Sequence, residues 1–125
     1  MQNYRALKVW EKAHRFTLAI YQATRKFPRS EMFGLTAQLR RACVSAETSI
    51  GEGSGRGSTP DFARFLDIAT GSINEAENLV LIALDLGYLD RSQAVLLAAD
   101  AVEVRKMLWS LLRRLRPSPG TEASP

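Results

Sequence analysis

The sequence is poor in the residues that form disulfides, metal sites and nucleophilic active sites. It contains one cysteine and one histidine in 125 residues, which excludes an internal disulfide and a structural zinc site of the Cys/His kind. We expect neither a metal nor another cofactor. No apolar run approaches the roughly 20 residues that a membrane-spanning helix needs. The first 14 residues carry no apolar block behind their basic side chains, so we expect no signal peptide and a soluble, cytoplasmic protein.

Strand-like alternation of apolar and polar residues is also missing. Apolar residues recur instead at steps of three and four, which is typical of amphipathic helices. The stripes predict four helices, from about Ala6 to Phe27, from about Ser30 to Glu52, from Ser58 to Gly87 and from Asp90 to Leu115. Pro28, the glycine-rich segment 51–57, Gly87 and Pro117 are the expected helix ends.

Four helices with short connections predict an all-α, up-down-up-down antiparallel four-helix bundle over residues 1–116. Residues 117–125 are rich in Pro and Ser, and we expect them to form a disordered tail. Further apolar residues widen the stripes beyond the needs of a lone bundle: Leu66, Ile73, Val80, Leu96, Val102 and Leu112. Because monomers avoid large exposed apolar patches, we expect a homo-oligomer.

Charge is segregated along the chain. Residues 1–41 carry +7, residues 42–103 carry −7 and residues 104–125 carry +4, which leaves +4 overall and a pI near 9.6. The first and last helices of an antiparallel bundle are neighbours, so their cations are expected to form one basic ridge. Rows of cations neutralise successive phosphates, and an exposed tryptophan can stack an unpaired base.

The residues predicted to bind RNA or DNA are Lys8, Lys12, Arg15, Lys26, Arg29, Arg105, Lys106, Trp109, Arg113, Arg114 and Arg116. Two alternatives remain open for these side chains. They form an ordinary solvated face, or they pair with acidic faces of other subunits or of a partner enzyme.

Polar residues beside the second and third stripes predict a half-buried network that sets helix register. Its expected members are Gln38, Arg40, Ser45, Glu52, Ser72 and Glu75. An acid/base pair of Glu52 and Glu75 is the catalytic alternative. It lacks a histidine, cysteine or metal beside it, so we expect a protein that is not an enzyme.

Three further features have a structural and a functional interpretation. Glu11 and His14 have the Glu-x-x-His spacing of di-iron bundles, but no second histidine exists, so His14 is expected at the surface. Cys43 lies in the second stripe and is expected to be a small core residue. Arg56, Ser58 and Thr59 precede the third helix, where free N–H groups form a generic anion site or a simple N-cap.

Several short motifs resemble those of one known family. They are Phe33-Gly34-Leu35, Gln38-Leu39-Arg40-Arg41-Ala42, Ile50-Gly51-Glu52-Gly53, Arg56, Phe62, Phe65-Leu66, Ile68-Ala69, Gly71-Ser72, Glu75 and Gly87-Tyr88-Leu89. In combination, over about residues 4–116, they resemble the four-helix-bundle proteins of the 23S rRNA intervening-sequence protein family. That family usually has Asn-Ile-Ala-Glu-Gly where this chain has Ser49-Ile50-Gly51-Glu52-Gly53.

The resemblance implies a bundle that assembles as a ring, commonly a pentamer, in a family whose biochemical function is largely unassigned. Similar proteins serve as accessory proteins of diversity-generating retroelements, where a basic pentameric bundle binds nucleic acid and a reverse transcriptase. By resemblance, Arg40, Glu52, Ser72 and Glu75 are structural or interface residues. The sequence therefore predicts a non-enzymatic oligomer that binds RNA or DNA or acts as a scaffold, with a module that binds a reverse transcriptase as the alternative.

Overall fold

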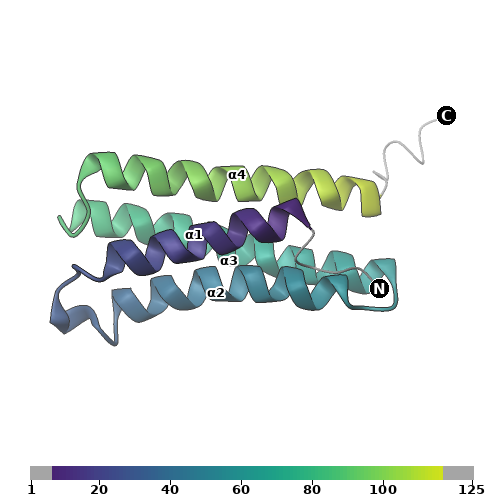
Figure 1. The fold of residues 1–125 in the computed structure, drawn as a ribbon, viewed down its shortest axis with the longest axis horizontal. Coiled ribbons are helices and arrows are strands. Elements are labelled where there is room, and N and C mark those ends of the chain that lie inside the picture. Colours follow the sequence, from purple (N-terminus) through teal and green to yellow (C-terminus); the bar gives the residue numbers. More distant parts are fainter. Residues whose placement is uncertain (1–6, 117–125) are drawn as a thin grey trace.

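A computed structural model describes residues 7–116 as a packed bundle of helices without a β-strand in that range. The elements are α1 (Lys8–Thr24), the 3₁₀ turn η2 (Arg29–Glu31), α2 (Leu35–Ser54), α3 (Thr59–Asp85) and α4 (Arg91–Leu115). Each long helix packs against the next, and α1 also packs against α4 (Figure 1). The predicted all-α four-helix bundle is confirmed. The predicted tail, residues 117–125, lies outside the described residues.

The core is formed by large apolar side chains from all four helices. Among them are Phe16, Ile20, Leu39, Ile50, Leu66, Ile73 and Leu108, which are almost completely buried. Leu66, Ile73 and Val80, expected to add apolar surface beyond the needs of the bundle, lie in the core instead. The predicted stripe of α3 is displaced at its start, where Phe62 and Phe65 are only half-buried and Ala63 and Leu66 are buried. From Ala76 to Ala83 the stripe lies in the core, and Leu86, just past the end of the helix, is exposed.

The start of α2 differs from the prediction. Ser30 does not cap a helix but lies in η2, and α2 begins five residues later, at Leu35. The Glu31 carboxylate accepts the backbone N–H of Leu35 at 3.0 Å. An acidic group is stabilising there, because the first N–H groups of a helix are unsatisfied and carry partial positive charge.

The starts of α3 and α4 follow the sequence signals. The Ser58 hydroxyl accepts the N–H of Asp61 at 3.3 Å. Asp90 and Gln93 form a reciprocal capping box, and the N–H of Gln93 lowers the pKa of the Asp90 carboxyl. Gly87 has φ of 80°, the left-handed conformation that ends α3 as predicted.

The end of α2 depends on a glycine with a packing role. The predicted end at Glu52 falls two residues short, because α2 continues through Gly53 to Ser54. A Cβ atom on Gly53 would lie 2.7 Å from the Cβ atom of Phe65 on α3. Gly53 therefore allows the two helices to approach closely.

Among the helices of residues 7–116, none combines the length and the apolar character that a membrane-spanning helix needs.

The Gly53→Ala variant is expected to lower the free energy of unfolding by about 1–3 kcal/mol, because the new methyl group overpacks a rigid contact. Gly55→Ala is the matched control, since a Cβ atom there meets only the Glu52 carbonyl oxygen, at an ordinary 3.6 Å. Urea unfolding followed by circular dichroism measures both. Equal stability of the two variants would contradict the packing role of Gly53.

Candidate nucleic-acid interface

The antiparallel order places the N-terminus of α1 beside the C-terminus of α4 (Figure 1). Lys8 from α1 and Lys106 and Arg114 from α4 line one groove between these helices. Its apolar lining includes Leu7, Val9, Met107 and Leu111, and Glu103 adds a single carboxylate. The neighbouring positions of α1 and α4 are as predicted. At this end of the bundle, three exposed cations from the two termini therefore share one surface.

Trp109 lies on α4 one turn after Lys106, outside the lining of the groove. Its side chain is 59% exposed, and the Arg113 guanidinium lies 4.8 Å from the centre of its ring. A cation at this distance is attracted by the ring and restricts its orientation. Arg113 and Arg114 also stabilise the last turn of α4, where the helix dipole favours positive charge.

Several of the predicted cations are already paired with carboxylates. The pairs are Lys12–Asp100 (3.0 Å), Arg15–Glu11 (3.6 Å), Arg116–Asp67 (2.7 Å) and Arg105–Glu77. Lys12 joins α1 to α4, whereas Arg105 and Arg116 join α4 to α3. Each pair is at least partly exposed to solvent, and such pairs contribute only about 0–1 kcal/mol. Their main consequence is local charge compensation, which leaves fewer uncompensated cations than the sequence predicts.

Lys26 and Arg29 are exposed but lie at the other end of the bundle. They follow the C-terminus of α1, and the 17 residues of α1 span about 25 Å at 1.5 Å per residue. The predicted ridge is therefore divided into two groups of cations at opposite ends. The reason is that α4 runs antiparallel to α1, so its basic last turn meets only the beginning of α1.

The polar residues predicted as one network have different partners. The Ser45 and Ser72 hydroxyls are hydrogen-bonded at 2.9 Å and join α2 to α3. Arg40 lies on the opposite side of α2, where its Nε donates to Thr24 at 2.8 Å and its guanidinium stacks on the Tyr21 ring. Arg40 therefore joins α2 to α1. The other expected members, Gln38, Glu52 and Glu75, are exposed.

The residues predicted as an anion site take part in ending α2 and starting α3. Arg56 lies 3.6 Å from the Glu52 carboxylate and stacks on the Phe65 ring. The Ser58 hydroxyl is engaged as the N-cap of α3, and Thr59 is the exposed first residue of that helix. The Glu52 carboxylate at the end of α2 thus compensates the positive charge of Arg56.

His14 has a partner that sequence spacing does not indicate. Its Nδ1 lies 3.0 Å from the Glu47 carboxylate on α2, and its ring stacks on Trp10 with centroids 4.9 Å apart. Glu11, the partner suggested by spacing, is paired with Arg15. Within residues 7–116, no group of three or more His, Cys, Asp or Glu side chains is arranged to hold a metal ion.

Cys43 is completely buried, as predicted for a small core residue. Burial in an apolar environment disfavours the thiolate and raises the pKa of Cys43 to about 11. The thiol is therefore protonated at neutral pH and is not an activated nucleophile.

These features define a small α-helical bundle protein with uncompensated cations at its ends. The chain belongs to the family described as 23S rRNA-intervening sequence protein, whose sequence model matches residues 5–110. The resemblance predicted from the motifs is thereby confirmed.

A solved structure shares the fold. It is the crystal structure of a protein with unknown function from the S23 ribosomal protein family of Bacteroides thetaiotaomicron VPI-5482. The two chains are 25% identical, with a TM-score of 0.79 over 84% of this chain and 98% of the other. None of the curated proteins matches the chain.

Native Cys43 is expected to react with a disulfide reagent at pH 8 at least about 100-fold more slowly than the unfolded chain. A rise of two pKa units above the ordinary value of 9.0 lowers the thiolate fraction by about that factor. The absorbance of the released thiolate measures both rates. Equal rates in the folded and unfolded protein would show that the thiol is accessible and ionised.

Proposed function

We propose that the protein is a non-enzymatic homo-oligomer that binds RNA or DNA at the end formed by the N-terminus of α1 and the C-terminus of α4. One observation carries this proposal: Lys8, Lys106 and Arg114 line a single groove, with exposed Trp109 close by on α4. We call these four residues and Arg113 the basic end.

The chemistry of the basic end suits a phosphate backbone with unpaired bases. Each cation that neutralises a phosphate releases a condensed counterion, which favours binding at low salt. An exposed aromatic ring beside cations adds a stacking surface for bases without sequence preference. A base in a duplex is already stacked on its neighbours, so the proposed ligand is single-stranded RNA or DNA.

Binding without catalysis is supported by the state of the candidate reactive groups. The raised pKa of Cys43 keeps its thiol protonated. His14 is engaged with Glu47, and Glu52 is paired with Arg56. None of these contacts forms the nucleophile and base pair that covalent catalysis uses.

A homo-oligomer is supported by the large apolar side chains that remain exposed on the described surface, among them Phe33, Leu81, Val95 and Leu96. The proposed form is the ring, commonly a pentamer, that the family resemblance implies. In a ring whose axis is parallel to the helices, every basic end faces the same way. Several weak contacts to one strand then add through effective concentration.

A second candidate function is a protein-interaction module, for which a reverse transcriptase is the partner that the resemblance implies. The ion pairs of Lys12, Arg105 and Arg116 favour it, because they remove charge from the predicted nucleic-acid surface. Under this alternative, the exposed apolar residues contact the partner protein.

Reversing the three groove cations (Lys8→Glu, Lys106→Glu and Arg114→Glu together) is expected to weaken binding of a single-stranded RNA by at least 10-fold. The slope of log affinity against log salt should fall by about one for each phosphate that is no longer neutralised. Fluorescence anisotropy with a labelled oligonucleotide at several salt concentrations measures both quantities.

The matched control reverses Arg25 and Lys26 at the other end of the bundle, and it is compared with Lys8→Glu and Lys106→Glu together, which change the net charge equally. We expect the control to retain most of the affinity. Equal decreases in the two double variants would indicate attraction to net charge rather than a defined site. Absence of salt-dependent binding by the native protein would overturn the proposal and favour the interaction module.

Trp109→Ala is expected to cost about 1–3 kcal/mol in binding single-stranded RNA, because one base no longer stacks on the ring. Binding of a fully paired duplex should change much less. The same anisotropy assay with both oligonucleotides tests this, with Trp109→Phe as the control that keeps an aromatic ring. An unchanged single-strand affinity in Trp109→Ala would remove Trp109 from the proposed site.

A further inference from the structure

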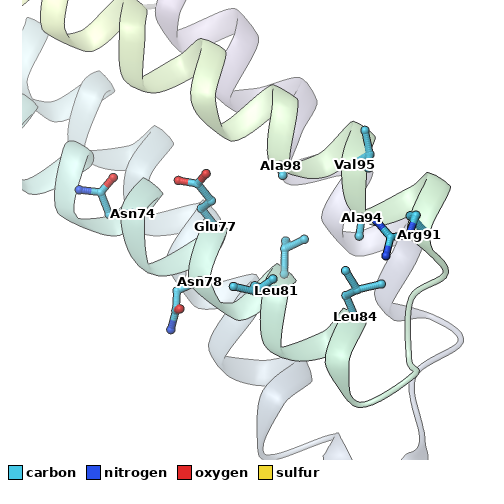
Figure 2. Close-up of a pocket in the computed structure, with 10 residues that line it drawn as sticks. Asn74, Glu77, Asn78, Leu81, Leu84, Arg91, Ala94, Val95 and Ala98 are labelled. Carbon is cyan, nitrogen blue, oxygen red and sulfur yellow. The ribbon is translucent and has the colours of Figure 1, made fainter.

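A groove of about 350 Å³ lies between α3 and α4, near the turn that connects them (Figure 2). Leu81 and Leu84 from α3 and Ala94, Val95 and Ala98 from α4 line this groove. Its floor is open because the two alanines are small. Polar groups lie at its ends, with Asn74, Glu77 and Asn78 along α3 and Arg91 at the start of α4. We call it the α3/α4 groove.

Apolar exposure extends beyond the groove. Leu81 and Val95, which line the groove, are 54% and 57% exposed. Ile82, Leu86 and Leu96 are exposed as well but lie outside the lining of the groove. Exposed apolar side chains at a groove are typical of a site that another surface covers.

The connection between α1 and α2 presents the opposite shape. Phe33 is 91% exposed and Met32 beside it is 48% exposed. This corner is held firmly, since the Glu31 carboxylate accepts the N–H of Leu35 and the hydroxyl of Tyr88, each at 3.0 Å. Phe33 is thus a protruding aromatic side chain on an ordered corner.

The corner and the groove lie at the same end of the bundle but on opposite sides. The Glu31–Tyr88 hydrogen bond joins the α1–α2 and α3–α4 connections directly. In the described bundle, α1 packs on α2 and α4, and α3 packs on the same two helices, so the α1/α2 side is opposite the α3/α4 side. Two copies that lie side by side with their helix axes parallel bring one corner level with the other's groove.

The charges of the two sides are complementary. Exposed Arg29 and Arg41 flank the corner, and Arg41 also lines the surface beside Met32. The groove side carries exposed Asp85 one turn beyond Leu81, whereas Glu77 at its edge is already paired with Arg105. Complementary potentials favour association and fix its orientation.

We propose that the α3/α4 groove binds the α1–α2 corner of a second copy of this chain, with Phe33 inserted between Leu81 and Val95. The inference rests on the homo-oligomer of the proposed function and names its interface. An inserted aromatic side chain buries about 150–250 Å². A stable interface buries at least about 1,200 Å² in total, so Met32 and further residues around the corner and the groove also contribute. Each copy offers both surfaces, so the contact is head-to-tail, and a constant rotation from one copy to the next about an axis parallel to the helices closes it into a ring.

Phe33→Asp and Leu81→Asp are each expected to reduce the native protein to a 13.9 kDa monomer in light scattering after size exclusion. Both positions are exposed, so circular dichroism should remain that of the folded bundle. Ile68→Asp is the matched control, because Ile68 is 43% exposed on the same helix as Leu81 but outside the groove. It should retain the native mass.

Mixing the two variants gives the sharper test. Phe33→Asp keeps an intact groove and Leu81→Asp keeps an intact corner, so one head-to-tail contact can form between them. The mixture should yield a dimer of twice the monomer mass that grows no further. A mixture that remains monomeric, or variants that keep the native mass, would overturn the proposed interface.

The outcomes separate this inference from the proposed function. A native protein that is monomeric at high concentration would overturn both the oligomer and its interface. Native oligomers unaffected by either variant would overturn the interface alone. RNA binding by the basic end is measured independently, since the basic end and the α3/α4 groove share no residue.

Discussion

Close approach of α2 and α3 is the contact on which the rest of the bundle depends. The buried residues between them are mostly small, as Ala46 and Gly53 on α2 and Ala69 and Ala76 on α3 illustrate. Small side chains let helix backbones approach closely, and the distance between axes follows from the residues at the contact. The large side chains of α1 and α4, such as Phe16 and Leu108, then fill the space beside this pair.

This arrangement determines where the charges of the chain remain uncompensated. The antiparallel order brings the basic beginning of α1 to the basic end of α4, while α3 carries most of its acids outward. Lys12 and Arg116 are drawn into ion pairs that join neighbouring helices. Uncompensated cations remain at both ends of the bundle, and large exposed apolar residues remain on the α1–α2 connection and on α3 and α4. Ligand binding at the basic end and self-association near the opposite end are therefore compatible in one molecule.

The helices and most of their boundaries are predictable because their signals are local. Ser58, Asp90 and Gly87 act through hydrogen bonds or backbone conformations within a few residues of their own position. Two fold predictions are wrong for reasons beyond that range. The stripe of α3 is displaced at its start, where packing against the neighbouring helices buries Ala63 and Leu66 rather than Phe62 and Phe65. The beginning of α2 is displaced because Glu31, rather than Ser30, reaches its first N–H groups.

The sequence by itself determined the four helices, their antiparallel order, the family and the segregation of charge, since these follow from spacing and composition. Only the tertiary structure decided which cations share a surface and which are neutralised. Arg40, expected beside Ser72, contacts Tyr21 instead, and His14 pairs with Glu47, 33 residues away. The physical reason is that the rotation of each helix about its axis is set by packing against its neighbours. A side chain's partner on another helix depends on that rotation, and no local pattern records it.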